Sequence, residues 1–140
     1  MKVGLFIPCY VDQFYPKVGI ATLELLEKLG CSVVFPLNQT CCGQPMANSG
    51  FEHLTQPCNT LFYNSFSDCD YVVSPSGSCV LHIKEHMKVD AKPAESKILR
   101  HKVYELVEFI TDVLQVDLVP VHFPYRVSIH QGCHGQRGLH

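Results

Sequence analysis

Four cysteines have a spacing that could build a metal centre. Two of them, Cys41 and Cys42, are adjacent and are followed directly by a glycine. In the sequence, 31 residues separate Cys9 from Cys41, and 36 residues separate Cys42 from Cys79. Deprotonated thiols are ligands that zinc and iron–sulfur clusters prefer. If the fold brings these four thiols together, they predict one metal site.

Short apolar runs that are typical of buried strands precede these cysteines. The predicted strands cover residues 2–7, 31–35, 71–73 and 126–130. Apolar residues at helical spacing predict helices over residues 16–29, 50–67, 79–86 and 95–116, and residues 119–124 are expected to be extended. Pro57 predicts an irregular start for the second of these helices. This order predicts an α/β fold, a Rossmann-like three-layer sandwich with a mostly parallel sheet of about four strands.

The predicted sheet explains how distant cysteines could meet. Cys9 follows the first strand, Cys41 and Cys42 follow the second, Cys79 follows the third and Cys133 follows the fourth. In a parallel sheet these loops lie at the same carboxyl edge, where open α/β folds bind their ligands. The helices that begin there direct their N-termini at the site, which favours thiolates.

Composition narrows the class of protein. The chain has 140 residues, of which 46% are hydrophobic and 17% are charged, and its net charge is −2. This charge provides no basic surface for nucleic acid. No apolar run approaches the roughly 18 residues of a membrane span. The first residues resemble a strand rather than a signal peptide, so we expect a cytoplasmic location, where eight cysteines favour metal binding or redox chemistry over disulfides.

Simpler roles are expected for the other cysteines. A single cysteine is most often a small buried hydrophobe, and this is the interpretation of Cys31, Cys58 and Cys69. A disulfide between Cys41 and Cys42 is an alternative to metal binding, although it would need a strained ring and an oxidising setting.

Three stretches resemble a known family, the cysteine-rich CCG domains. They are Phe6-Ile7-Pro8-Cys9-Tyr10-Val11-Asp12, Thr40-Cys41-Cys42-Gly43-Gln44-Pro45-Met46 and Pro75-Ser76-Gly77-Ser78-Cys79. The family includes the cysteine-rich subunit of heterodisulfide reductase and the iron–sulfur subunit of glycolate oxidase, and the stretches are most similar to the lactate-utilisation protein A group. The resemblance covers essentially the whole chain.

The resemblance implies a cofactor and partners. It implies an iron–sulfur cluster, of the 4Fe–4S type, bound by Cys9, Cys41, Cys42 and Cys79. The chain would be an electron-transfer subunit, not catalytic alone, of a complex that oxidises a 2-hydroxy acid such as L-lactate or glycolate. The other subunits of that complex would include a ferredoxin-like iron–sulfur protein.

The same thiols leave an alternative open. They could hold one tetrahedral zinc ion, and the chain would then be a structural module that docks partner subunits. Adjacent cysteines can ligate two different irons, whereas two neighbours in sequence fit one zinc ion less comfortably. Iron–sulfur binding is therefore the first interpretation.

The sequence departs from the family pattern in two places. Where the cysteine-rich subunit of heterodisulfide reductase has a Cys-x-x-Cys pair, this chain has Cys79 and His82, so His82 is a candidate to replace the missing ligand. An exposed histidine on the helix is the simpler interpretation. The family usually carries two cysteine motifs, and residues 133–140 resemble the opening of a second copy. We therefore expect residues 1–125 to form the first CCG domain and residues 126–140 to begin a second, truncated repeat.

The remaining histidines and the tail carry weaker expectations. Surface positions are expected for His53, His86, His101, His122 and His140, and His130 and His134 flank Cys133. Without a second half, Val127, Ile129 and Leu139 are expected to be uncovered. Exposed apolar patches usually become interfaces. We therefore expect a twofold homodimer with its contact in the region after Val119.

Overall fold

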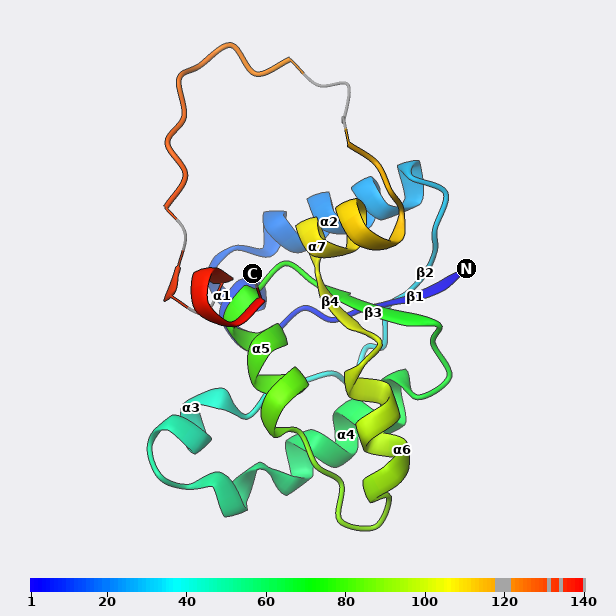
Figure 1. Ribbon diagram of the computed structural model, residues 1–140, viewed down its shortest axis with the longest axis vertical. Coiled ribbons are helices and arrows are strands. Elements are labelled where there is room, and N and C mark those ends of the chain that lie inside the picture. The colour runs from blue at the N-terminus through cyan, green and yellow to red at the C-terminus, as the bar shows by residue number, and fades with distance from the viewer. Residues whose placement is uncertain (118–121, 131, 134, 140) are drawn as a thin grey trace.

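Four short parallel strands form the centre of the molecule. The computed structural model describes residues 1–117, 122–130, 132–133 and 135–139. The sheet has the order β2-β1-β3-β4, and every pair is parallel (Figure 1). The strands are β1 (Lys2–Leu5), β2 (Ser32–Val34), β3 (Tyr71–Ser74) and β4 (Val103–Glu105). The predicted parallel α/β architecture is confirmed.

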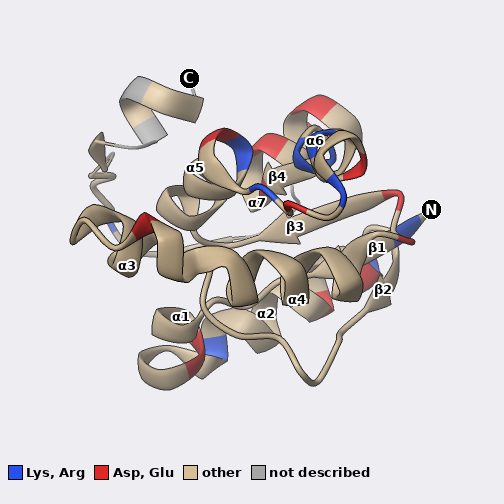
Figure 2. Cartoon of the chain, turned by 90° about the horizontal axis from the view of Figure 1, so that it is seen from below, with Lys and Arg blue, Asp and Glu red and all other residues tan. Residues whose placement is uncertain are grey.

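Helices cover both faces of this sheet, which makes three layers (Figures 1 and 2). One face carries α1 (Cys9–Phe14), α2 (Pro16–Lys28) and α7 (Leu106–Glu108), and α7 continues into a π-helical turn, η2 (Phe109–Val113). The other face carries α4 (Gln56–Phe66), α5 (Gly77–His86) and α6 (Pro93–Arg100). Between β2 and α4 lie α3 (Gln44–Asn48) and the 3-10 turn η1 (Glu52–Thr55), so the irregular start predicted from Pro57 is confirmed.

The two central strands send alternate side chains to opposite cores. Val3 and Leu5 of β1 pack with Leu26 and Phe109 on one face of the sheet. On the other face, three aromatic rings form the centre of the second core: Phe6, Phe62 and Phe66. Because strand side chains alternate, a short apolar run is enough to anchor both layers.

The long helix predicted over residues 95–116 is wrong. The chain leaves α6 at Arg100 and enters β4, whose Val103 is fully buried and aligned with Val72 of β3. Apolar residues of this segment recur at helical spacing because α6, β4 and α7 each place some of them in a core. Pairing with the sheet edge outweighed local helix propensity.

The fourth strand predicted over residues 126–130 is also wrong. These residues form no strand, and Val127 and Ile129 are 69% and 88% exposed. The alternating pattern of Arg126 to His130 fits a strand, but β4 already occupies the sheet edge beside β3. Cys133 therefore follows no strand of the sheet.

The described end of the tail lies against α5. The π-helical turn η3 (Gly135–Leu139) places Leu139, partly buried, on the core that contains Phe62. The expectation that Leu139 is uncovered is therefore wrong. The extended run expected over residues 119–124 lies partly outside the described residues. His134 and His140 also lie outside them. Within the described residues, no helix has the length and apolar character of a membrane span.

Gly4 lies where β1 meets α4, and its lack of a side chain permits this contact. A Cβ at this position would lie 2.5 Å from Cδ1 of Phe66, whose side chain is fully buried. We expect Gly4→Ala to reduce the free energy of unfolding by about 1–3 kcal/mol, because the ring cannot move away without repacking the core. Urea denaturation measures the change. Gly132→Ala is the matched control, since a Cβ there meets nothing within 4 Å, and equal stability of both variants would contradict the prediction.

Candidate functional site

The fold places the four predicted cysteines at the carboxyl edge of the sheet. Cys9 is the first residue of α1 and follows β1, and Cys79 lies in the first turn of α5 after β3. The chain crosses from β1 to β2 on one side and returns to β3 on the other side of β1. Adjacent strands whose connections diverge in this way open a crevice, which is the usual ligand position in such sheets.

The thiols contact one another in two pairs. Cys9 donates a hydrogen bond to Cys41, and Cys42 donates one to Cys79. Cys9 is also close enough to Cys79 for charge on one thiol to affect the other. Cys9 is exposed and Cys41 half-buried, whereas Cys42 and Cys79 are only 4% and 8% exposed. The site therefore runs from the surface into the aromatic core.

The surroundings of the buried pair, Cys42 and Cys79, determine which of the two thiols keeps its proton. The hydrogen bond from Cys42 lowers the pKa of the Cys79 thiol to about 6, with further help from the hydroxyls of Ser76 and Ser78. The same hydrogen bond, together with burial, raises the pKa of Cys42. Cys79 also lies at the N-terminus of a ten-residue helix, where the macrodipole favours negative charge. Cys79 is therefore the first of the two to become a thiolate.

The pKa of Cys9 is shifted upward, whereas that of Cys79 is shifted downward. Partial burial of the thiol and its hydrogen bond to Cys41 raise the pKa of Cys9 to about 11. The negative charges that Cys41 and Cys79 could carry act in the same direction. Like charges at one site favour the neutral forms unless a cation neutralises them, and this is the electrostatic condition that a metal centre relieves.

The donor set restricts the metal that could bind. It consists of four sulfur atoms, which suit zinc or iron–sulfur clusters rather than magnesium or calcium. Within the described ranges, no group of three or more His, Cys, Asp or Glu side chains is arranged to hold a single metal ion. The donor chemistry of these thiols suits either an iron–sulfur cluster or a zinc ion.

Gly43 shapes the loop that carries the adjacent cysteines. Its φ is +92°, a left-handed conformation that glycine adopts without strain. Its N–H donates to Sγ of Cys41 at 3.4 Å. A Cβ at this position would lie 3.2 Å from Thr55 and 3.5 Å from Nε2 of His82. The glycine therefore allows the loop to turn and to pack closely against α5.

Gln39 holds this loop in place, and no sequence pattern predicts that role. The side-chain oxygen of Gln39 accepts a hydrogen bond from the N–H of Ile7 at 2.7 Å. Its amide nitrogen donates to the carbonyls of Leu5 at 3.2 Å and Pro36 at 2.9 Å. One side chain thus links the loop after β2 to the carboxyl end of β1. Sequence reasoning missed it because only the fold brings residue 39 to residue 7.

His82 does not lie on the surface, so that interpretation is wrong. The residue is 5% exposed, and burial lowers the pKa of its imidazole, with a smaller effect from His86. Its ring lies 5.3 Å from the ring of His86. Its position beside Gly43 keeps it close to the cysteine loop.

The other sequence candidates divide into confirmed and unexpected positions. Cys31 and Cys69 are buried, as predicted. Cys58 is half-buried and lines a small cavity together with Cys41, which makes it a fifth thiol near the site. Cys133 is exposed. Surface positions are confirmed for four of the five histidines expected there, and His130 is exposed as well; the four are His53, His86, His101 and His122.

Comparisons with known proteins identify the family of the chain. Residues 3–84 match the model of the CCG family, described as a cysteine-rich domain. Lactate utilization protein A of Geobacillus kaustophilus is 47% identical, and the match covers 99% of this chain and 60% of the relative. Lactate utilization protein A of Bacillus subtilis is 46% identical with the same coverage. The chain thus spans about 60% of the length of these relatives. No solved structure matches the chain significantly.

Removal of the Gln39 side chain tests its structural role. In Gln39→Ala, the N–H of Ile7 loses its hydrogen-bond partner. Ile7 is only 8% exposed, so water does not readily replace that partner. We expect the free energy of unfolding to fall by about 1–3 kcal/mol, the usual cost of an unsatisfied buried group. Thermal and urea denaturation measure it. Gln13→Ala is the control, because Gln13 is exposed and bonds only to Asp12 among the described residues. A loss no larger than in the control would show that the loop is fixed by other contacts.

Proposed function

Because the chain belongs to the family of CCG cysteine-rich domains, we propose that it binds an iron–sulfur cluster and transfers electrons during the oxidation of a 2-hydroxy acid. The observation that carries this proposal is that four thiols, on three loops after β1, β2 and β3, lie close enough for their charges to interact. The names of the relatives, lactate utilization proteins, support L-lactate as the substrate of the pathway, with glycolate as the second choice.

The residues that would hold the cluster are Cys9, Cys41, Cys42 and Cys79. Their sulfur atoms supply the four ligands that a 4Fe–4S cluster needs. Such a cluster, when bound, accepts and releases single electrons. Gly43 and Gln39 position the loop that carries two of the ligands, and the buried position of His82 makes it a candidate supplementary ligand.

The exposure of Cys9 supports exchange of electrons with another protein. The two inner cysteines are buried, but Cys9 lies at the surface. Beside it, exposed aromatic side chains of α1 and the residue that follows it lie within ring contact: Tyr10 to Phe14 at 5.1 Å and Tyr10 to Tyr15 at 5.7 Å. Exposed aromatic groups are frequent in protein interfaces. We propose that a partner subunit, such as a ferredoxin-like iron–sulfur protein, docks at this position.

The whole protein and its location are also proposed. The family match over residues 3–84 supports residues 1–125 as the first CCG domain, and residues 126–140 are proposed as the start of a second repeat. All eight cysteines are free thiols, which supports a cytoplasmic, reducing location. A structural zinc module that docks partner subunits is the alternative that the first experiment excludes or establishes.

Metal analysis of protein purified without oxygen tests the cofactor. We expect iron and acid-labile sulfide in the wild type, and loss of most of both in Cys41→Ser and Cys79→Ser, because each variant removes a ligand. Cys69→Ser is the matched control: this thiol is also buried, at 3% exposure, but it precedes β3 and lies at the opposite edge of the sheet. Full iron and sulfide in Cys41→Ser would remove that ligand from the site. One zinc ion per chain without sulfide would establish the alternative.

We also propose a homodimer of this chain, with its contact in the region after Val119. The exposure of Val127 and Ile129, together with that of Phe123 and Tyr125, supports it. Sedimentation velocity at micromolar concentration should show a species of twice the chain mass. Replacing Val127 and Ile129 by Ser should shift it to the monomer, because the buried apolar area falls. A monomeric wild type throughout this concentration range would refute the dimer.

A further inference from the structure

A cavity of about 340 Å³ lies between the end of α5 and α6, outside the segment that matches the CCG family. Three of its lining residues are basic, Lys88, Lys97 and Arg100, and one is acidic, Asp90. We propose that this pocket binds a small organic anion, in which a single carboxylate or phosphate group is attached to a short apolar body. The volume lies within the usual range for small-molecule sites, roughly 300–1,000 Å³.

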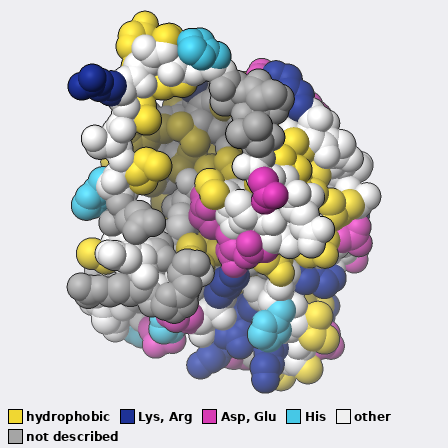
Figure 3. Space-filling view, turned by 45° about the horizontal axis from the view of Figure 1, so that its top comes forward, with side chains coloured by type: hydrophobic (Ala, Val, Ile, Leu, Met, Phe, Trp, Pro, Cys, Tyr) yellow, Lys and Arg dark blue, Asp and Glu magenta, His cyan; other side chains and the backbone are white. Residues whose placement is uncertain are grey.

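The charge of the chain is concentrated around this pocket. Six of the 11 basic residues lie within residues 84–102, together with three acidic residues, so this segment has a net charge of +3 in a chain of −2. Figure 2 shows basic residues on α5 and α6, and Figure 3 shows basic side chains gathered on one part of the surface. One of the six, Lys84, is neutralised by an ion pair with Glu108. The rest of the chain is acidic, so the positive potential is local to this region and would attract anions to it.

Arg100 is the pocket-lining residue whose chemistry best suits an anionic group. Its Nη1 donates to the carbonyl of Glu85 at 2.9 Å, which holds the guanidinium at the end of α5. Its Nε is buried and has no hydrogen-bond partner among the described residues. Because this N–H has almost no accessible surface, an anion in the pocket would bind the outer N–H groups of the guanidinium. Guanidinium groups bind carboxylates and phosphates through two parallel hydrogen bonds.

The loop that forms the pocket wall is held rigidly. Met87 and Val89 are buried, at 1% and 4% exposure, and Lys88 between them is directed outward. The amide of Asn59 on α4 donates to the carbonyl of Lys88 at 3.0 Å. The N–H of Val89 donates to the hydroxyl of the buried Ser96 on α6. The loop backbone is therefore positioned before a ligand arrives, which lowers the entropic cost of binding.

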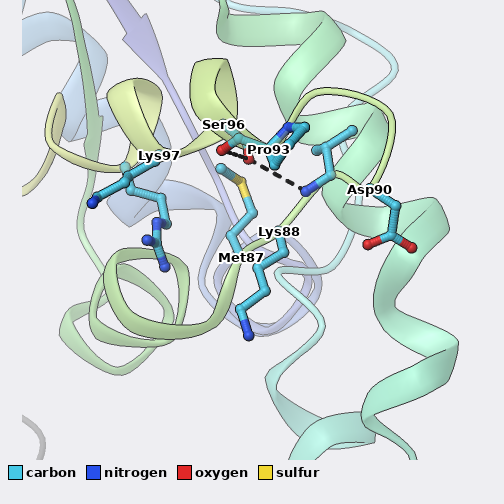
Figure 4. A pocket seen from close by; sticks show the side chains of 8 residues that line it. Met87, Lys88, Asp90, Pro93, Ser96 and Lys97 are labelled. Carbon is cyan, nitrogen blue, oxygen red and sulfur yellow. Dashed lines mark hydrogen bonds between the residues drawn. The ribbon is translucent and has the colours of Figure 1, made fainter.

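The lining also restricts the ligand. Figure 4 shows Asp90 on the opposite side of the pocket from Lys97, with Met87 and Pro93 between them. The carboxylate of Asp90 would repel a second negative group, which disfavours polyphosphates and nucleic acid. Met87, Val89 and Pro93 offer apolar surface to the remainder of the ligand. A ligand with one anionic group on a short apolar body matches both the charged and the apolar parts of this lining.

Two probes distinguish the two anionic groups. Butyrate supplies a carboxylate on a short apolar body, and inorganic phosphate supplies the phosphate group alone. We expect at least one of them to cause saturable shifts of the backbone amide signals of Val89 and Ser96 in ¹H–¹⁵N spectra of the full chain at constant ionic strength. Saturation by butyrate alone identifies the carboxylate as the recognised group, and saturation by phosphate alone identifies the phosphate.

Variants test whether these residues bind the probe. We expect Arg100→Met to weaken binding by about tenfold or more, because a charge-assisted hydrogen bond is lost. Arg100→Lys keeps the charge but loses the paired donors and should be intermediate. Lys88→Gln, on an exposed side chain that the fold does not need, should weaken binding several-fold. Lys28→Gln on α2 is the control for a general charge effect and should leave binding unchanged.

Two results would overturn the proposal. The first is the absence of saturable shifts with either probe up to about 50 mM, far above the dissociation constants of ordinary small-molecule sites. The second is an equal loss of affinity in Lys28→Gln and Lys88→Gln, which would show that the anion responds only to net charge. Circular dichroism and melting of each variant separate lost binding from lost structure. Neither result depends on the metal content of the cysteine site.

Discussion

The parallel pairing of β1 with β3 is the constraint on which the rest of the structure depends. Gly4 of β1 is aligned with Val72 of β3, so the two strands end side by side and release Cys9 and Cys79 into neighbouring loops. Gln39 joins the loop after β2 to the end of β1 through hydrogen bonds with the backbone of Ile7 and Leu5. Strand pairing thus sets the place of the site, and one side chain completes it.

The thiols belong to the hydrophobic core as well as to the site. Cys42 and Cys79 pack in the cluster that contains Phe6 and Phe62, so the inner half of the site rests on close-packed aromatic rings. Protein interiors of this density resist deformation. The outer half, at Cys9, faces solvent. This arrangement keeps the two inner thiols fixed while leaving Cys9 accessible for contact with another molecule.

Local sequence patterns predicted most of the fold correctly. The errors concern residues whose structure depends on pairing with distant parts of the chain. Three strands and the positions of their cysteines followed from apolar runs and from the single carboxyl edge of a parallel sheet. β4 was missed because its three residues carry a helical period, and their pairing with β3 is not visible in sequence. Gln39, Cys58 and the burial of His82 share this cause: each depends on neighbours more than ten positions away.

One helix connects the two regions of chemical interest and explains their difference. The first turn of α5 carries Cys79, where the positive end of the macrodipole and two serine hydroxyls favour a thiolate. Its last turn presents carbonyl groups that need donors, and Arg100 satisfies the carbonyl of Glu85. With about 1.5 Å per residue, α5 separates these ends by roughly 15 Å. The helix therefore favours anionic sulfur at one end and cations at the other, and the cations that complete its C-terminus also line the anion pocket.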